Sequence, residues 1–290
     1  METIHTIPWM KQIGQEARRT ERLLGLVPTM GALHEGHLSL IRRAKEQCAP
    51  VVVSIFVNPK QFGPSEDFQK YPRPMEADRA ALEEMGVDYL FAPTPEEMYP
   101  AGFRTIVDVE RLSERLEGRS RPGHFRGVAT VVLKLLEIVQ PRFAFFGRKD
   151  AQQVRIIQQM TRDLNLDAEI VVCPIVREAD GVALSSRNAY LSAEERKAAT
   201  VLSRSLDTVR KQIDAGERQV VRLLASLRQE IERERAVTLD YAEIVDADTF
   251  EPAVSLREKC CVLLAARVGS TRLIDNALIE ADGDILRVTL

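Results

Sequence analysis

Two histidines three residues apart, His34 and His37, stand directly after a short apolar run and at the expected start of a helix. That spacing puts both imidazoles on one face of a helix, so both can face the same ligand. We expect the helix start to add unpaired backbone N–H groups, and Gly31 and Gly36 to permit a close approach of the backbone. Such a site suits phosphate, because histidine donates hydrogen bonds to phosphate oxygens as charge develops.

The same histidine pair has two plainer interpretations, an incidental placement or half of a zinc site. A helical zinc-protease pair needs the spacing HExxH, with the glutamate as base, whereas this segment is HExH. No cysteine or third histidine lies at a plausible ligand spacing. Zinc is therefore the weaker hypothesis, and incidental placement stays open on these residues alone.

Amide side chains follow the next apolar run, which covers residues 51–57. Asn58 and Gln61 stand at its end, where they could bind the hydroxyl and carboxylate groups of a small substrate. An ordinary turn is the competing interpretation, because Asn-Pro and Phe-Gly are common turn dipeptides. The polar loop that follows, residues 64–74, is long enough to act as a lid.

Charged groups follow a later apolar run, within residues 147–153. Lys149 stands where a phosphate chain would arrive, and lysine supplies a compact positive charge there. Asp150 could cap the following helix or bind a ligand hydroxyl, and both interpretations stay open. Gln153 lies one helical turn later on a similar face, so it could contact the same ligand.

Two further loops carry hydroxyl and basic groups. After Gly181, the residues Ser185, Ser186 and Arg187 could clamp the β- and γ-phosphates of a nucleotide, although serines beside arginine are common in loops. Residues 119–127 are rich in arginine and could attract phosphate or carboxylate. For this last segment a solvated charged loop is the simpler interpretation.

The elements that must position these residues alternate between strand and helix. Short apolar runs predict strands, and longer segments with apolar residues at helical spacing predict helices between them: strands at 23–27, 51–57, 87–92, 142–146 and 169–176, and helices at 38–48, 75–85, 126–139 and 151–164. This alternation predicts an α/β fold with a Rossmann-like, doubly wound parallel sheet. Its ligands are expected beyond the carboxyl ends of the strands, where the candidate residues lie.

The pattern changes after about residue 178. Two amphipathic stripes predict helices and three later segments predict strands without crossover helices between them: helices at 198–213 and 220–231, and strands at 239–245, 260–268 and 272–279. We therefore expect a nucleotide- and substrate-binding domain over residues 1–178 and a smaller C-terminal α+β domain over residues 179–290.

Composition narrows the possible partners and compartment. The chain has 290 residues, 45% of them hydrophobic, and a formal net charge of −3, so no strong field draws it to nucleic acid. Its four cysteines show no CxxC spacing, which is typical of buried reduced thiols. No run approaches the roughly 20 apolar residues that cross a bilayer, and no secretion signal is recognisable. These features predict a cytoplasmic protein with neither membrane nor nucleic acid as partner.

Six segments together resemble the pantothenate synthetase (pantoate-β-alanine ligase) family over nearly the whole chain: PTMGALHEGHLSLI, SIFVNPKQFGPSEDFQKYPR, RPGHFRGV, FFGRKDAQQ, LSSRNAYLS and TRLIDN. The resemblance implies an AMP-forming ligase that makes a C–N bond. The pantoate carboxylate attacks the α-phosphorus of ATP and releases pyrophosphate, and β-alanine then attacks the pantoyl adenylate. The resemblance also implies Mg²⁺ carried mainly by the ATP phosphates, and a homodimer.

The resemblance further implies roles for individual residues. His37, as proton donor, would act with His34 and Lys149 in catalysis. Pantoate and β-alanine would contact Gln61, Gln153 and Asn58, and no metal site on the protein is expected. Contacts to ATP would come from Met30, Gly31, Ala32, Leu33, His34, Glu35, Gly36, His37, Gly147, Arg148, Lys149, Asp150, Val176, Leu184, Ser185, Ser186 and Arg187.

These residue types suit the implied reaction, because in-line displacement at phosphorus needs positioning and charge neutralisation more than a covalent nucleophile.

Two alternative functions remain open. A nucleotidyltransferase of the same HxGH fold group shares the histidines, but its phosphorylated acceptor would call for more cations than the set Asn58, Gln61 and Gln153 offers. A non-catalytic nucleotide- or RNA-binding module is the second, and the near-zero net charge argues against RNA.

Overall fold

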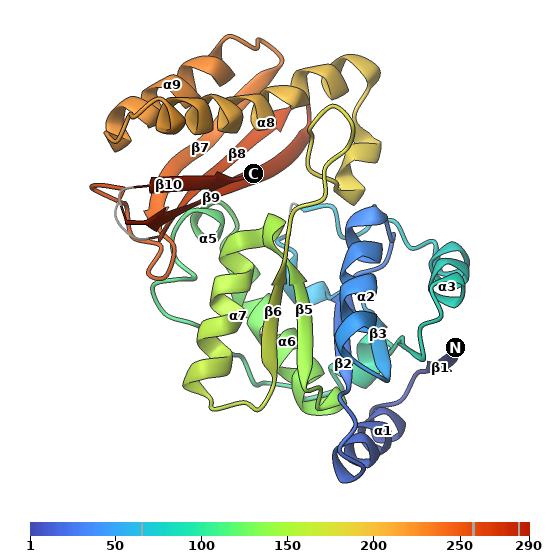
Figure 1. Cartoon of the computed structure of the whole chain (residues 1–290). Coiled ribbons are helices and arrows are strands. Elements are labelled where there is room, and N and C mark those ends of the chain that lie inside the picture. Colours follow the sequence, from blue (N-terminus) through green and yellow to red (C-terminus); the bar gives the residue numbers. More distant parts are fainter. Residues whose placement is uncertain (65, 257–258, 284) are drawn as a thin grey trace. The chain divides into compact units, whose positions relative to one another are not determined.

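The computed structural model describes residues 1–64, 66–256, 259–283 and 285–290 of the chain (Figure 1). Its contacts divide the described chain into two compact units. The first contains residues 1–148 and 152–174, and the second contains residues 149–151 and 175–290. The division into domains 1–178 and 179–290 stays a prediction.

The first unit is built on a six-stranded parallel sheet in the order β1–β4–β3–β2–β5–β6. Because β3 and β4 lie on one side of β2 while β5 and β6 lie on the other, the winding reverses at β2 and β5, which is where such folds bind ligands. The predicted Rossmann-like, doubly wound sheet is thus confirmed. Its strands are β1 (Glu2–Ile4), β2 (Gly25–Thr29), β3 (Val51–Ile55), β4 (Tyr89–Phe91), β5 (Phe143–Gly147) and β6 (Glu169–Cys173).

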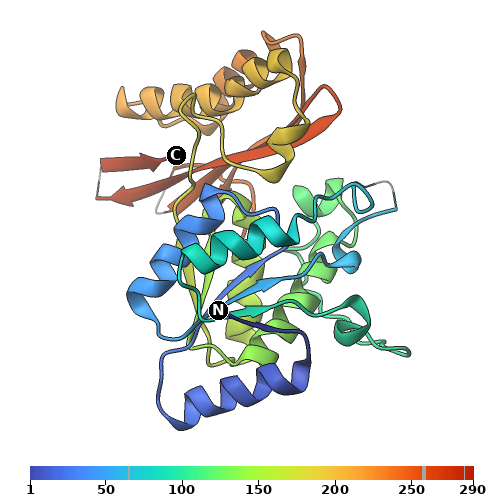
Figure 2. The same ribbon diagram turned by 90° about the vertical axis from the view of Figure 1, so that its right-hand side faces the viewer.

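Helices cover both faces of this sheet, as a parallel sheet requires. Figure 2 shows α2 and α6 on opposite sides of it. Leu40, Ile41 and Ala44 of α2 form a core with sheet residues such as Val53 and Phe145, and every residue of β3 is buried, as its apolar run predicted. The connecting helices are α2 (Glu35–Gln47), α3 (Met75–Glu84), α6 (His124–Val139) and α7 (Ala151–Asp163).

Some elements of the first unit were not predicted. The buried residues of helix α1 (Ile7–Arg19) are Met10, Gly14 and Ala17. It packs closely on α6, because a Cβ atom on Gly14 would lie 2.3 Å from the carbonyl oxygen of Val139. Strand β6 ends before the predicted residue 176, at a proline that has no N–H to donate. Also unpredicted were β1 and the short helices α4 (Pro95–Met98), α5 (Glu117–Ser120), η1 (Pro59–Gln61) and η2 (Arg148–Asp150).

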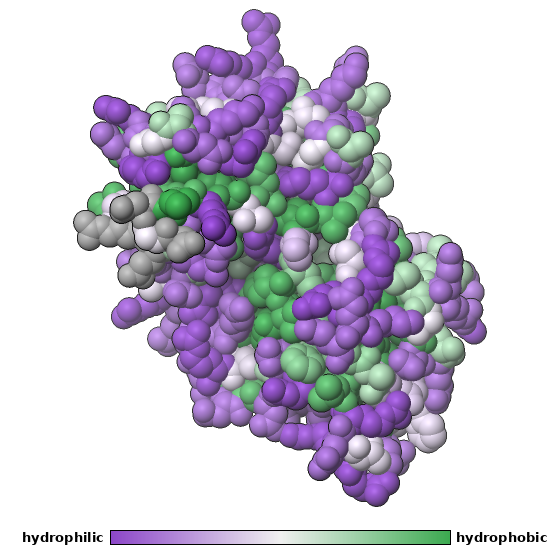
Figure 3. All heavy atoms as spheres, in the orientation of Figure 1, coloured by the Kyte–Doolittle hydropathy of each residue, from purple (hydrophilic) through white to green (hydrophobic). Residues whose placement is uncertain are grey.

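The second unit packs two helices on a four-stranded antiparallel sheet in the order β10–β9–β8–β7, as predicted for a small α+β fold. The outer surfaces of α8 and α9 are mainly hydrophilic in Figure 3, which fits their amphipathic stripes. Strand β10 was missed because its residues are exposed or only half-buried. The elements are η3 (Ser186–Tyr190), α8 (Ala193–Asp214), α9 (Val220–Glu232), β7 (Val237–Asp246), β8 (Lys259–Val268), β9 (Thr271–Asp282) and β10 (Ile285–Thr289).

Two further features concern the cysteines and the character of the helices. The four cysteines, Cys48, Cys173, Cys260 and Cys261, are all buried and none forms a disulfide, which confirms the prediction of buried free thiols. Within the described ranges, no helix combines the length and the apolar character that crossing a membrane requires.

Candidate functional site

The two histidines after β2 lie against each other at the start of α2. Their ring centroids are 4.1 Å apart, so the two rings are neighbours, and their facing one ligand stays a prediction. The Nδ1 atom of His34 accepts the N–H of Gly36 at 3.2 Å, and the Nδ1 atom of His37 accepts the N–H of His34 at 3.3 Å. Because each Nδ1 is an acceptor, the neutral rings carry their protons on Nε2. Both Nε2–H groups can therefore donate to an anion.

The backbone N–H groups around these histidines are already used within the protein. Ala32 and Leu33 donate to the two carboxylate oxygens of Asp78, each at 2.8 Å. The N–H of Gly31 donates to the hydroxyl of Thr29 at 3.1 Å. The N–H groups of His34, Gly36 and His37 also have partners. Our expectation of unpaired N–H groups was wrong at these six positions, because each N–H group donates a hydrogen bond within the loop or the N-terminal cap of α2. A phosphate would meet the imidazoles instead.

Asp78 is a structural residue of the site that the sequence did not reveal. It lies in α3 with 3% of its surface exposed and holds the loop before His34 through the two N–H groups just described. Gly31 must be glycine here, because its φ is +80° and a Cβ atom would lie 2.9 Å from the Asp78 carboxylate. Asp78 and Leu82 are the two buried residues of α3. An acidic residue on the buried face of a helix calls for partners.

Asn58 is fully engaged within the protein. The side chain is 1% exposed, and its Nδ2 donates to Gln61 Oε1 at 3.0 Å and to the carbonyl of Gly127 at 3.1 Å. Its Oδ1 accepts the N–H of Lys60 at 3.2 Å and the hydroxyl of Tyr99 at 2.8 Å. Since both ends of the amide have partners, Asn58 fixes the orientation of Gln61.

Gln61 is the amide that retains donor capacity. It is 9% exposed, and its Nε2 lies 3.0 Å from the thioether sulfur of Met30. Sulfur of this kind is only a weak acceptor, so the NH₂ group remains able to donate strongly to a carboxylate. The structure thus brings together Met30 after β2 and Gln61 after β3, as expected from the parallel order of these strands.

Gly127 explains why the turn at Gln61 can pack so closely on α6. A Cβ atom at this position would lie 2.2 Å from the carbonyl oxygen of Lys60 and 2.6 Å from the Cα of Gln61. Only a residue without a side chain allows that approach. The sequence showed a glycine in a basic segment and gave no indication of what lay opposite it.

The basic segment 119–127 is not a solvated loop at its centre. Arg121 forms a bidentate ion pair with Glu66 at 2.7 and 2.9 Å, and the two side chains are 15% and 22% exposed. His124 accepts from Arg121 at 3.1 Å, and its Nδ1–H donates to the carbonyl of Gln61 at 2.8 Å. Desolvation, with the Arg121 charge, lowers the pKa of His124 from 6.5 to about 4. The simpler interpretation is therefore wrong for Arg121 and His124, which hold the turn at Gln61.

The ion pair also ties the predicted lid to the rest of the first unit. Glu66 lies within the loop 64–74, whose residue 65 is outside the described residues. Phe62 and Phe68 of the same region lie with ring centroids 5.3 Å apart. These contacts stabilise one arrangement of the loop, and its action as a lid stays a prediction.

Two neighbouring glutamines of α7 have different environments. Gln152 is 4% exposed, and its Nε2 donates to the carbonyls of Leu112 and Arg115 at 2.7 and 2.9 Å, so it supports the preceding loop. Gln153, the predicted substrate contact, is only partly buried in the first turn of the helix.

At the end of β5, a Cβ atom on Gly147 would meet nothing within 4 Å. A side chain at this position would therefore meet open space.

In the second unit, Lys149 and Asp150 lie in the turn η2. The Lys149 side chain is 22% exposed, and its ammonium lies 3.7 Å from the Asp150 carboxylate. Its main-chain carbonyl accepts a hydrogen bond from Asn276 Nδ2 at 2.9 Å. Both predicted nucleotide-binding side chains are thus accessible in part, and the main chain that carries Lys149 is anchored by β9.

The segment with Ser185, Ser186 and Arg187 follows a small antiparallel pair of chain segments. Leu184 donates its N–H to the carbonyl of Val176 at 3.0 Å, next to a β-bridge between Arg177 and Ala183. Ser185 Oγ accepts the N–H of Arg187 at 3.3 Å and so caps η3. The structure assigns Ser185 a local structural role, whatever else it binds.

Two further predicted features have clear positions. Glu35 forms an ion pair with Arg42 on the exposed side of α2, so its carboxylate is engaged with its own helix. In the described part of the chain, no group of three or more histidine, cysteine or acidic side chains could hold a metal ion.

Paired imidazoles after β2 and a partly satisfied amide after β3 lie at the carboxyl ends of a doubly wound parallel sheet, where α/β proteins of this class bind their ligands. The family model described as Pantoate-beta-alanine ligase matches residues 2–278. The chain belongs to this family.

Individual relatives agree with the family match. A pantothenate synthetase from Heliobacterium modesticaldum is 55% identical over 280 residues, which cover 97% of this chain and 100% of that protein. One from Caldicellulosiruptor bescii is 52% identical over 281 residues, with the same coverage of 97% and 100%.

Solved structures show the same fold. The crystal structure of pantothenate synthetase from Thermus thermophilus has a TM-score of 0.90 at 46% identity, covering 95% of this chain and 98% of that one. A pantoate-beta-alanine ligase from Francisella tularensis, complexed with beta-gamma ATP and beta-alanine, has a TM-score of 0.78 at 36% identity, covering 95% and 97%.

Proposed function

We propose that this chain condenses pantoate with β-alanine at the expense of ATP, forming pantothenate, AMP and pyrophosphate through a pantoyl adenylate. Its membership of the pantoate-β-alanine ligase family supports the overall reaction. The structural observation that carries the proposal is the His34–His37 pair, whose Nδ1 atoms are held by backbone N–H groups. The reaction needs donors where negative charge accumulates on phosphate, and the two Nε2–H groups supply them.

In the first step, the pantoate carboxylate attacks the α-phosphorus and the bond to the bridging oxygen of pyrophosphate breaks. We assign His37 as the principal donor to the charge that develops on the phosphates, with His34 beside it. Lys149 neutralises phosphate charge, and Ser186 and Arg187 hold the phosphate chain. No covalent intermediate on the enzyme is required.

Pantoate must be held with its carboxylate in line with the bond that breaks. We assign this role to the Gln61 amide, whose weak contact to Met30 sulfur leaves it a strong donor. Gln153 is assigned to the pantoate hydroxyls. Asn58 acts through Gln61, because its own amide is bound on both sides. The loop 64–74 would protect the adenylate from water.

The remaining nucleotide contacts follow the same reasoning. We assign Gly147, where a Cβ atom would meet open space, to a close approach by the nucleoside. Asp150 would bind the ribose hydroxyls. The others line the nucleotide mainly through their main chain or apolar atoms: Met30, Gly31, Ala32, Leu33, Glu35, Gly36, Arg148, Val176, Leu184 and Ser185.

Three broader assignments belong to the same proposal. Mg²⁺ would enter as part of the MgATP substrate, since its phosphate oxygens are the hard ligands that this ion prefers. The buried free thiols fit a reducing, cytoplasmic compartment. A homodimer is expected from the family resemblance, and sedimentation at several protein concentrations tests it.

The exchange of labelled pyrophosphate into ATP tests the first step. Exchange should require pantoate and proceed without β-alanine, because the adenylate forms before the amine reacts. Gln61→Glu should raise the pantoate KM at least tenfold, since it places a carboxylate against a carboxylate. Gln158→Glu, on α7, makes the same change and should leave that KM within about twofold. Exchange that ignores pantoate but requires a phosphorylated acceptor would support the nucleotidyltransferase alternative instead.

A further inference from the structure

Two adjacent residues of β9, Asp275 and Asn276, are almost completely buried although both are polar. Their exposed fractions are 3% and 2%. Successive side chains of a strand point to opposite faces, and the odd-numbered neighbours Leu273, Ala277 and Ile279 belong to the core under α8 and α9. Asp275 therefore lies on the helix-covered face and Asn276 on the other. Buried polar groups at neighbouring positions need specific partners on both faces.

The partner of Asn276 is the main chain of Lys149. Asn276 Nδ2 donates to the Lys149 carbonyl at 2.9 Å, across 127 residues of sequence. The turn that contains Lys149 belongs by its contacts to the second unit, although β5 and most of α7 on either side belong to the first. This hydrogen bond is thus a specific link between that turn and β9.

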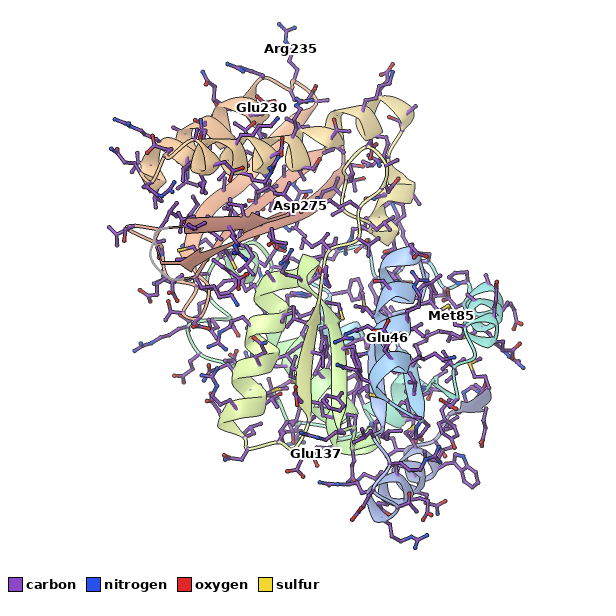
Figure 4. The ribbon with its side chains drawn as sticks, viewed as in Figure 1. Glu46, Met85, Glu137, Glu230, Arg235 and Asp275 are labelled. Atoms are coloured by element: carbon purple, nitrogen blue, oxygen red, sulfur yellow. The ribbon has the colours of Figure 1, made fainter. Side chains whose placement is uncertain are left out.

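Asn276 is itself held rigidly by its neighbour. Its N–H donates to Asp275 Oδ1 at 2.8 Å, and the Asp275 carboxylate receives two hydrogen bonds from Arg177, at 2.7 and 2.9 Å. Arg177 also donates to the carbonyl of Gly181 at 3.0 Å, which fixes the segment that leads to Ser185. Figure 4 shows Asp275 on the sheet of the second unit. The Asn276 amide therefore extends from a main chain that is held in place.

We propose that Asn276 is a positioning residue for ATP binding, which acts by fixing the main chain that carries Lys149. The proposal rests on the proposed role of Lys149 at the ATP phosphates. A lysine ammonium sits at the end of four flexible bonds, so its position depends on where its Cα is held. When the anchor is removed, the short turn η2 gains freedom, and the ammonium spends less time where a phosphate can meet it.

A double-mutant cycle on the ATP dissociation constant, measured by titration calorimetry, separates positioning from general structure. Asn276→Ala should weaken ATP binding about tenfold when Lys149 is present, a coupling in the usual range for connected residues. In a Lys149→Ala background the same substitution should change the dissociation constant by less than about twofold, because there is no ammonium left to position. Equal factors in the two backgrounds would overturn the proposal.

Controls keep the outcome unambiguous. Asn165→Ala, at an exposed asparagine of the first unit, should leave the dissociation constant unchanged in both backgrounds. Asn276→Thr, which also lacks the amide but suits a strand, repeats the cycle if the alanine variant does not fold. Loss of folding in both variants would also overturn the proposal, because Asn276 would then be required for the stability of the fold. Failure of the unmodified protein to bind ATP would instead contradict the proposed function.

Discussion

At the scale of single residues, the chemistry depends on which nitrogen of each imidazole carries the proton. His34 and His37 are held by backbone N–H groups at Nδ1, at 3.2 and 3.3 Å, and this orientation is built into the start of α2. A histidine that had to rotate or change tautomer before each reaction would lose part of its effect as a donor. Preorganised donors are effective because no reorganisation is needed when charge develops.

Replacing His37 therefore tests this role directly. His37→Ala should lower the rate of pantoate-dependent pyrophosphate exchange by roughly 10² to 10⁴, the range for a lost acid or charge-stabilising donor. His5→Ala is the matched control, since His5 is exposed and hydrogen-bonds the carbonyl of Ala92. The control should retain its rate within about twofold. An unchanged rate in His37→Ala would remove His37 from the mechanism.

His124 predicts a pH dependence of stability. Its pKa falls from 6.5 to about 4 in the folded protein, first through desolvation and then through Arg121. The unfolded chain therefore binds more protons between these values. The stabilisation from His124 is present in full above pH 6.5 and is lost as the pH falls toward 4, with a span of roughly 3 kcal/mol.

Urea unfolding of the wild type and His124→Gln between pH 4.5 and 7 measures this contribution. The free energy of unfolding should fall less steeply with decreasing pH in the variant. Equal slopes in wild type and His124→Gln would show that folding does not lower the pKa of His124.

At the scale of elements, the position of Gln61 depends on how closely α6 packs on η1. A Cβ atom on Gly127 would lie 2.2 Å from the Lys60 carbonyl oxygen, so either α6 or η1 must shift in Gly127→Ala. We expect a loss of about 1–3 kcal/mol in stability from overpacking. We also expect the pantoate KM to rise about tenfold, because displacement of the turn misaligns the Gln61 amide.

Steady-state kinetics and thermal melting check this expectation. Glu137→Ala is the matched control on the same helix, at an exposed position that Figure 4 labels. It should change neither the pantoate KM nor the melting temperature appreciably. If Gly127→Ala destabilises the protein and leaves the pantoate KM unaltered, the packing matters for folding alone.

The sequence predicted the elements better than the contacts between them. Strong apolar periodicity located most helices and strands, and parallel strand order then brought Met30 and Gln61 together. Helix α1 was not predicted, although it buries Met10, Gly14 and Ala17. Asp78 and Asn276 could not be assigned, because each binds main chain that is far away in sequence. Local patterns carry no information on such partners.

At the scale of the whole molecule, the burial of all four thiols predicts slow chemical modification. Burial raises the pKa of Cys48 to about 11, so little of the reactive thiolate exists at neutral pH. The native protein should therefore react with a chromogenic disulfide reagent far more slowly than the unfolded protein. In denaturant, four thiols per chain should titrate rapidly. Rapid modification of the native protein would contradict the buried placement.

We expect this chain to catalyse one ligation that needs two different acids, pantoate and β-alanine. Its most direct test is to incubate the purified protein with MgATP and to measure AMP and pantothenate by chromatography. One AMP should form for each pantothenate, over many turnovers and only when both pantoate and β-alanine are present. Sustained AMP formation at the same rate without β-alanine, or with a phosphorylated acceptor in place of pantoate, would contradict it.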